Sequence, residues 1–493
     1  MNSGIVFLEI NEVPYRVLDY YVEKCPRSAT ASLMAESTQF VTFCNDEVEL
    51  DPWISWPTLH RGVNDTAHGI LRLGQILDNA DKRYPPIWRI LADHKVRVGL
   101  FGSVHSGHIP EDLTNYPFYV PDFFDDEVFA HPAHLLPFQR FNLGMTRRSA
   151  RNVDAAVPFD LLKDFLRSLP SLGLSPKTAL AIARQLLDER VQPRVKLRRR
   201  SMQGLLAADL YFDLVKRYRP AFSTYYTNHL AAAMHRYWAA AFPGDYETRV
   251  LPEEWFNDYS DEVFHALTTV DMILARAKKL CSSLNATLVV AGSMGQAAVT
   301  HDPIRHFLTM TNVTNFMGVL GVEPSDVRVR HAMVPSTGAV IPVDRVEEIC
   351  AKLDSITING RNFKRTVNEA APLSYAVYDD GYISFFSYFG NSDGSGVATL
   401  GNQQFSLEEA GFTIMPNDDG VAVTAHHDPE GVLMVWHPDH GPLFSGRRNA
   451  STIEIAPAIL ARFGIDRPDY MVAPGDDLLK SFLAPESRLS AAN

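Results

Sequence analysis

The sequence predicts an α/β protein in which a mostly parallel sheet lies between helices. Short apolar runs at residues 4–10 and 286–291 are typical of strands that are buried on both faces. Helical segments alternate with such runs, which is the pattern of a parallel sheet with crossover helices. The chain has 493 residues, 46% of them hydrophobic, and can form two domains or one large domain with insertions.

The core elements follow from the same patterns in chain order. The first strand, at 4–10, ends in Asn11 and Glu12, and open α/β sheets place their sites at such carboxyl ends. The other expected core elements are a helix at 15–36, a helix at 87–93, strands at 96–101 and 222–226, a helix at 261–283, strands at 286–291 and 431–436, and a closing helix at 453–463.

Two insertions interrupt this alternation. A helical insertion at about 105–220 includes the basic run RVQPRVKLRRR; such a run is usually a solvated face, and a surface for a phosphorylated or acidic partner is the alternative. A smaller α+β insertion has expected strands at 339–342, 375–378 and 382–388 and a helix at 344–353. The expected domains are a first core part at 1–324, a cap-like α+β insertion at 325–420, and a closing core part at 421–493.

Charge and cysteine content restrict the partners and the compartment. The net charge of −12 argues against binding of polymeric nucleic acid or of an anionic membrane. The four cysteines form no CxxC pair, and we find no secretory leader and no apolar run of membrane-spanning length. We therefore expect a cytoplasmic protein with a small-molecule substrate, and the oligomeric state stays open.

Residues 51–74, DPWISWPTLHRGVNDTAHGILRLG, hold the strongest local signal. A helix over 58–63 can start at Pro57, because proline in a first turn loses no hydrogen bond. Ser55 and Thr58 would then lie at or beside a helix N-terminus. There the free N–H groups favour an anion, and a hydroxyl can hold or attack a phosphate. A capping role for either hydroxyl is the alternative.

The same stretch resembles a known family. Ser55-Trp56-Pro57-Thr58 followed by His68-Gly69-Ile70 is similar to the nucleophile segment of the alkaline phosphatase superfamily, in its type I phosphodiesterase and nucleotide pyrophosphatase branch. The resemblance implies an alkaline-phosphatase-like core and a phosphorylated substrate. It also implies Ser55 as the nucleophile. The interval to His-Gly is about one helical turn shorter than in the family, so Thr58 is the alternative.

The first-strand motif and the one after residues 286–291 differ from the family, which binds two metal ions through Asp and His residues. Its Asp-Gly after the first strand corresponds to Asn11-Glu12, and its Ser-Asp-His-Gly corresponds to Gly292-Ser293-Met294-Gly295. The resemblance therefore implies one altered metal site that Asn11 marks. Glu9 or Glu12 could supply a replacement carboxylate.

The two remaining metal motifs keep histidines. The middle motif corresponds to Asn228, His229 and His235, and the last to His426-His427 before a Gly-Val-Leu strand. Imidazoles suit a divalent ion, and zinc or manganese is the expected metal. The metal residues that the resemblance implies are Asn11, Asn228, His229, His235 and His427.

These motifs lead to two functional hypotheses. The first is a phosphoester hydrolase or phosphoryl-type transferase that keeps one metal site. The alternative is a catalytically degenerate member of the superfamily that acts as a binding or scaffold module, which the loss of the Asp-His pair favours. A metal-free reaction of Ser55 with His60 or His229 as the base is a third possibility.

Overall fold

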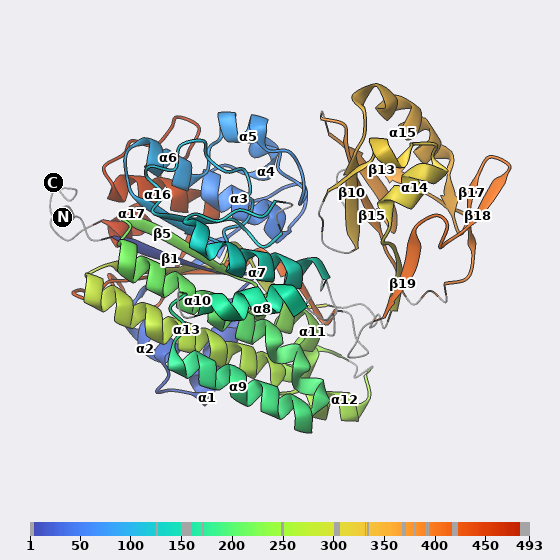
Figure 1. Cartoon of the computed structure of the whole chain (residues 1–493). Coiled ribbons are helices and arrows are strands. Elements are labelled where there is room, and N and C mark those ends of the chain that lie inside the picture. The colour runs from blue at the N-terminus through green and yellow to red at the C-terminus, as the bar shows by residue number, and fades with distance from the viewer. Residues whose placement is uncertain are drawn as a thin grey trace.

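An eight-stranded sheet forms the centre of the molecule (Figure 1). The computed structural model describes residues 4–124, 127–148, 159–169, 172–247, 251–299, 306–330, 332, 335–366, 371–378, 380–390, 392, 394–416 and 423–483. The strand order is β22-β2-β21-β6-β1-β5-β3-β4. The bounds are β1 (Ile5–Ile10), β2 (Thr38–Phe43), β3 (Val98–Phe101), β4 (Phe118–Val120), β5 (Phe222–Thr227), β6 (Thr287–Ala291), β21 (Glu430–Trp436) and β22 (Arg447–Ser451).

The sheet is mostly parallel, as the sequence predicts. Only β21 runs antiparallel to its neighbours, β2 and β6. The middle strands β1, β5 and β6 are buried along their whole length, because helices cover both faces. The predicted α/β class, with a mostly parallel sheet between helices, is confirmed.

Side chains of β1 alternate between the two helical layers. Ile5 and Phe7 pack into one hydrophobic cluster, and Val6, Leu8 and Ile10 pack into the other. One layer holds α3 (Pro52–Arg61), α4 (Asp65–His68), α5 (Asp78–Arg83), α6 (Ile87–Asp93), α16 (Ile455–Arg462) and α17 (Asp476–Phe482). The other holds α1 (Tyr15–Lys24), α2 (Ala29–Glu36), α7 (Leu136–Arg148), α8 (Phe159–Ser168), α9 (Pro176–Val191), α10 (Arg199–Tyr218), α11 (His229–Ala241), α12 (Glu253–Tyr259) and α13 (Glu262–Leu284).

Two helices differ from the sequence prediction. The helix expected at 15–36 is broken into α1 and α2, because Pro26 cannot continue a helix and Ser28 caps a new one. Helix α3 starts at Pro52, not behind Pro57, since the Asp51 carboxylate accepts a hydrogen bond from the Trp53 N–H at 2.9 Å. Ser55 is therefore the fourth residue of α3, and Thr58 lies beyond its first turn.

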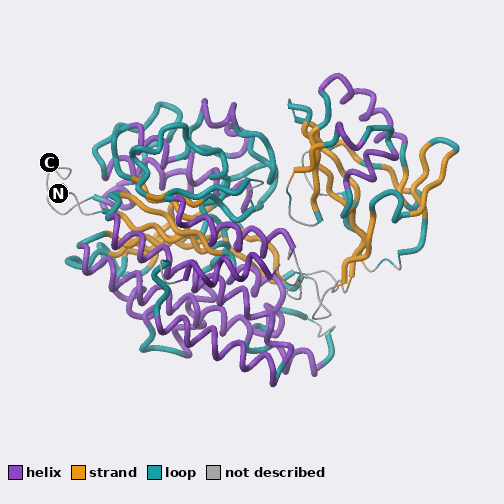
Figure 2. The backbone as a smooth tube through the Cα atoms, viewed as in Figure 1, coloured by secondary structure: helices purple, strands orange, loops and turns teal. Residues whose placement is uncertain are grey.

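The α+β unit lies beside the core and has its own hydrophobic cluster (Figures 1 and 2). Its sheets are β13-β14-β15-β10-β9, β16-β8-β19 and β12-β11-β17-β18. The bounds are β8 (His306–Met310), α14 (Val313–Val319), β9 (Arg328–Arg330), β10 (Ser336–Val340), α15 (Val346–Ser355), β11 (Thr357–Ile358), β12 (Arg361–Asn362), β13 (Lys364–Arg365), β14 (Leu373–Val377), β15 (Tyr382–Ser387), β16 (Phe389–Gly390), β17 (Val397–Leu400), β18 (Gln403–Ser406) and β19 (Phe412–Pro416).

The unit begins earlier than the expected boundary at 325, since β8 and α14 already pack into its cluster. Two bonds join the unit to the loop after α4. The Tyr382 hydroxyl donates to the Leu73 carbonyl at 3.0 Å, and Arg330 Nε donates to the Gly74 carbonyl at 2.9 Å.

A small two-stranded sheet connects the unit with the core. Strand β7 (Gly295–Ala298) follows β6, and β20 (Ala425–Asp428) precedes β21; they pair antiparallel with His427 opposite Gln296. This pairing brings His427 to the carboxyl end of β6, next to the end of β1. Among the described helices, none is both long and apolar enough to cross a membrane.

Candidate metal centre

Three side chains meet at the carboxyl ends of the central strands. Glu12 is the second residue after β1, His235 lies on α11, and His427 lies on β20; their ligand atoms all lie within 4.8 Å of one another. Glu12 Oε2 is 2.8 Å from His235 Nε2 and 3.6 Å from His427 Nε2. A carboxylate and two imidazoles are a ligand set that zinc and related ions use.

Backbone carbonyls orient both imidazole rings. His235 Nδ1 lies 2.8 Å from the Ala425 carbonyl, and His427 Nδ1 lies 2.7 Å from the Leu50 carbonyl. Because a carbonyl only accepts hydrogen bonds, each Nδ1 carries a proton, and Nε2 of each ring faces Glu12. His235 Nε2 donates a hydrogen bond to Glu12 Oε2 at 2.8 Å, and its lone pair becomes available to a metal when that proton leaves. Metal-binding histidines in proteins are held in this way.

Glu12 is fixed in an unusual backbone conformation. Its φ of 54° lies in the left-handed region, which non-glycine residues adopt rarely and mostly where neighbouring structure enforces it. Asn11 Nδ2 donates to Glu12 Oε1 at 2.8 Å, and Gln296 Nε2 donates to Oε2. These bonds aim the carboxylate between the two rings.

The charges of the three groups suit a cation. Burial alone would raise the pKa of Glu12, but His235, His427 and the hydrogen bonds from His235 and Gln296 outweigh it and lower the pKa to about 2. Burial lowers the pKa of His427. At neutral pH the cluster therefore offers an ionised carboxylate and a neutral His427 imidazole, which are the protonation states that bind metal.

The cluster opens on the side of His235. The His235 side chain is 26% exposed, against 10% for His427 and 3% for Glu12. Three protein ligands with one accessible side are the composition of catalytic rather than structural zinc sites. The donor set, its orientation and its access thus fit one divalent ion.

Asn11 and Asn228, both predicted as metal residues, lie beside the cluster and support it. The Trp56 Nε1–H donates to Asn11 Oδ1 at 2.7 Å, and Asn11 Nδ2 donates to Asn228 Oδ1 at 2.7 Å. Both side-chain oxygens therefore already accept hydrogen bonds. We interpret the two amides as a bridge that ties α3 and α11 to the end of β1.

His229 lies outside the cluster. Its Nδ1 is 2.7 Å from Thr227 Oγ1, and its Nε2 is 3.3 Å from the Ala266 carbonyl on α13. Burial lowers the pKa of His229 to about 4, so that the ring is neutral. Its neighbours make it a hydrogen-bonded core residue, although it was among the expected ligands.

The two candidate nucleophiles have different surroundings, and both are fully buried. Ser55 Oγ lies 2.8 Å from Ser293 Oγ at the end of β6. Thr58 Oγ1 donates to Asp46 Oδ1 at 2.5 Å and lies 3.0 Å from His68 Nε2. His68 Nδ1 accepts the Ile70 N–H, so His68 Nε2 carries the proton and donates to Thr58.

Neither His426 nor the basic run supplies a ligand atom to the cluster of Glu12, His235 and His427. His426 is exposed, and its ring centroid lies 4.6 Å from that of His427 and 6.4 Å from that of His235, but its nitrogens are not among the converging ligand atoms. In the basic run, Arg194, Arg198 and Arg199 pair with Asp258, Glu262 and Glu189. Intrachain acids therefore neutralise much of this run, which weakens the idea of an anion-binding surface.

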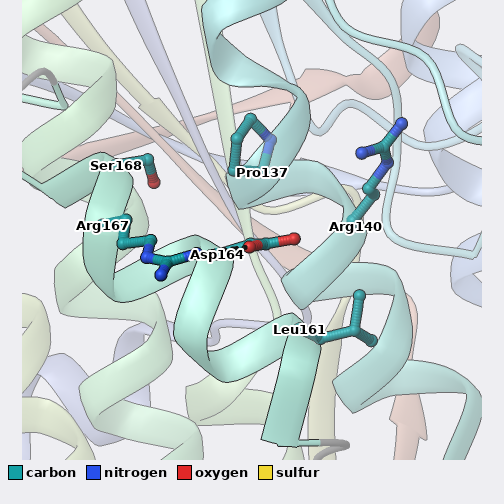
Figure 3. A pocket seen from close by; sticks show the side chains of 6 residues that line it. All are labelled: Pro137, Arg140, Leu161, Asp164, Arg167 and Ser168. Carbon is teal, nitrogen blue, oxygen red and sulfur yellow. Dashed lines mark ion pairs between the residues drawn. The ribbon is translucent and has the colours of Figure 1, made fainter.

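A surface pocket of about 300 Å³ lies between α7 and α8, on elements that contribute nothing to the metal cluster (Figure 3). Its cations are partly neutralised, since Arg167 lies 3.8 Å from Asp164 within the pocket. The lining residues are Pro137, Arg140, Leu161, Asp164, Arg167 and Ser168.

No protein-family model and no curated protein matches the chain. Among solved structures, the chain is similar to murine ectonucleotide pyrophosphatase/phosphodiesterase 5, with a TM-score of 0.41 and 10% sequence identity. That similarity covers 96% of this chain and 97% of the other.

Proposed function

We propose that the chain is a phosphoester hydrolase or phosphoryl-type transferase of the alkaline phosphatase superfamily with one divalent-metal site. The observation that carries the proposal is the convergence of Glu12, His235 and His427, with both Nδ1 atoms bonded to carbonyls. The resemblance of the Ser-Trp-Pro segment to the nucleophile segment of that superfamily supplies the reaction class.

Zinc or manganese is the metal that we propose for these residues. Imidazole nitrogen and carboxylate oxygen suit both ions, and two histidines with one glutamate form a common catalytic zinc set. A bound ion would supply Lewis acidity and neutralise negative charge on a phosphoryl group.

Ser55 is the hydroxyl that we assign as the nucleophile. The Thr58 hydroxyl already donates to Asp46 and accepts from His68, so its hydrogen bonds join α3 to Asp46 and to α4. The Ser55 hydroxyl meets another hydroxyl, Ser293, at the carboxyl end of β6. A hydroxyl pair of this kind can exchange its mutual bond for a bond to a phosphoryl oxygen with little loss.

The binding-module alternative also has an observation in its favour. Ser55 and Ser293 are both 0% exposed, and a nucleophile must contact its substrate. If that burial persists when ligand binds, the chain would hold a phosphorylated compound without turning it over. We propose a small phosphorylated compound as the ligand in either case.

A cytoplasmic location is proposed with this function. All four cysteines are free thiols in the structure. Reduced thiols suit a compartment in which disulfides do not persist.

Turnover of p-nitrophenyl phosphate and bis(p-nitrophenyl) phosphate by metal-loaded protein tests the proposal. Ser55→Ala should lower turnover by more than about a thousandfold, with metal content unchanged, because it removes the attacking group. Thr58→Val, the matched control, should lower thermal stability and keep the activity of the folded protein.

Two outcomes would contradict these assignments. Equal activity in Ser55→Ala would remove Ser55 as the nucleophile. No turnover by metal-loaded wild type on any phosphoester, with retained binding of phosphorylated ligands, would favour the binding module.

A further inference from the structure

Helix α9 in the helical insertion buries several polar residues and exposes several large apolar ones. Its polar residues Thr178, Gln185 and Glu189 are buried, whereas its apolar residues Leu180 and Leu187 are 63% and 60% exposed. An ordinary surface helix has the reverse arrangement. Ala181 and Ile182 pack against the core cluster, and the other large apolar residues of α9 face away from the protein.

Polar contacts fix this orientation. Gln185 Nε2 donates to the Val195 carbonyl at 2.7 Å, and Arg199 Nη2 lies 2.6 Å from Glu189 Oε2. At the start of the helix, Ser175 Oγ accepts the Thr178 N–H at 3.2 Å. A rotation that buried the leucines would break the first two bonds and would also expose Ala181 and Ile182, which pack against the core cluster.

The exposed apolar residues form a stripe. Leu180, Leu187 and Val191 recur at intervals of seven and four, which places them on one side of a helix. Val191 is 80% exposed, and Leu186 beside the stripe is 50% exposed. Four of the eleven large apolar side chains that are exposed in the described residues lie on this helix, so the stripe is not chance scatter.

Cations lie within and beside the stripe, since Arg184 is on the same side of the helix between Leu180 and Leu187, and Lys177 and Arg190 flank it. Lys177, Arg184 and Arg190 are exposed, and none of them has an ion-pair partner among the described residues. Asp188 is the exposed acidic residue of α9, because Glu189 is buried against Arg199. The surface is therefore locally positive in a chain of net charge −12.

We infer that α9 binds an anionic lipid surface, with Leu180, Leu187 and Val191 inserted at the boundary of the acyl chains and the three cations at the headgroups. Interfacial helices combine an apolar side with flanking Lys and Arg, whose long stems reach outward. Negative lipid headgroups complement the local charge.

The composition of the stripe favours lipid over a protein partner. Protein interfaces draw most of their affinity from aromatic side chains and arginine, and leucine and valine contribute less. The stripe on α9 is aliphatic and contains no aromatic residue. The expectation of no membrane partner relied on the charge of the whole chain, whereas this inference relies on the local charge of one helix.

Co-sedimentation of the full chain with vesicles tests the inference. Wild type should bind vesicles of phosphatidylcholine with phosphatidylglycerol and should not bind vesicles of phosphatidylcholine alone. Leu180→Asp combined with Leu187→Asp should weaken binding on the order of tenfold or more. Arg184→Gln should weaken binding by about fivefold, since one headgroup contact is lost.

Matched controls keep the result specific to α9. Val343→Asp changes an apolar residue of the α+β unit that is also 63% exposed, and Arg328→Gln removes an exposed cation there. Both should bind vesicles as wild type does. Thermal unfolding of every variant checks that it is folded.

The inference would be overturned if wild type fails to bind anionic vesicles or if the double leucine variant binds them equally well. It would also be overturned if light scattering shows a dimer that the double variant dissociates, because a second copy would then cover α9. Neither outcome bears on the metal centre, which is tested separately.

Discussion

Strand β1 brings two carboxylates close to imidazoles, and only one of the two groups has the features of a site. Glu9 Oε1 lies 2.7 Å from His60 Nε2, and Glu12 Oε2 lies 2.8 Å from His235 Nε2. The distances are nearly equal. The surroundings differ, since the Glu9 and His60 side chains are 0% and 2% exposed whereas His235 is 26% exposed.

The remaining atoms of the two groups differ as well. His60 Nδ1 and Glu9 Oε2 are buried and have no hydrogen-bond partner among the described residues. Trp56 and Trp88 pack on His60, at 5.5 and 4.8 Å between ring centroids. The Glu9–His60 pair is thus a contact that holds α3 on β1. A carboxylate and an imidazole at bonding distance do not make a metal site; a second ring, ring nitrogens oriented toward the carboxylate, and access are also needed.

The largest expected effect concerns the buried pair. His60→Leu should lower the free energy of unfolding by about 3–5 kcal/mol, because it leaves Glu9 buried without its partner. Urea unfolding measures the loss. Metal content should stay at the wild-type level. Loss of metal from this variant would show that the Glu9–His60 pair is needed for the metal centre.

The next effect concerns Glu12. Glu12→Gln should weaken metal binding by more than about a hundredfold, since loss of a direct ligand exceeds the 10–100-fold cost of losing a supporting residue. Competition with a chromogenic chelator measures the change. His426→Ala is the matched control, because His426 neighbours His427 on β20 but is not one of the three residues whose ligand atoms converge. Equal metal affinities of Glu12→Gln and wild type would show that Glu12 is not a metal ligand.

The carboxyl group of Asp51 provides a third case for comparison, because it is partly buried and no imidazole is bonded to it. Desolvation raises the pKa of Asp51 to about 7, and Glu49 adds to the effect. A folded-state pKa above the unfolded value of about 3.9 means that wild type loses stability as pH rises from 4 to 7. Asp51→Asn keeps an N-cap and removes this cost.

Asp51→Asn should therefore be more stable than wild type by about 2 kcal/mol above pH 7, an amount reduced for the partial exposure of Asp51. The difference should vanish toward pH 4. Urea unfolding at both pH values measures it. A constant difference across this range would mean that Asp51 does not titrate there.

Much of the fold could be predicted from the sequence, because burial on both faces leaves unbroken apolar runs such as those of β1 and β6. Strand direction leaves no such pattern, so the antiparallel course of β21 could not be predicted. The start of α3 at Pro52 could also have been predicted, but the Ser-Trp-Pro motif favours a start at Pro57 instead. Asp51 followed by Pro52 is a typical cap with proline at the first position.

The site was predictable only in part. His235 and His427 came from the family resemblance, and the structure brings them together. Helical spacing could have separated His229 from His235, since six residues turn a helix by about 240° past a full turn. The place of Glu12 depends on a left-handed backbone and on Gln296, and the orientation of His427 depends on Leu50; both partners lie far away in sequence.

Metal content of the full chain, purified without chelator, tests the central claim most directly. Elemental analysis should find about one zinc or manganese ion per chain in wild type and in His426→Ala, and none in His427→Ala. No metal in wild type, and none recovered on titration with either ion, would contradict the claim that Glu12, His235 and His427 form a metal centre.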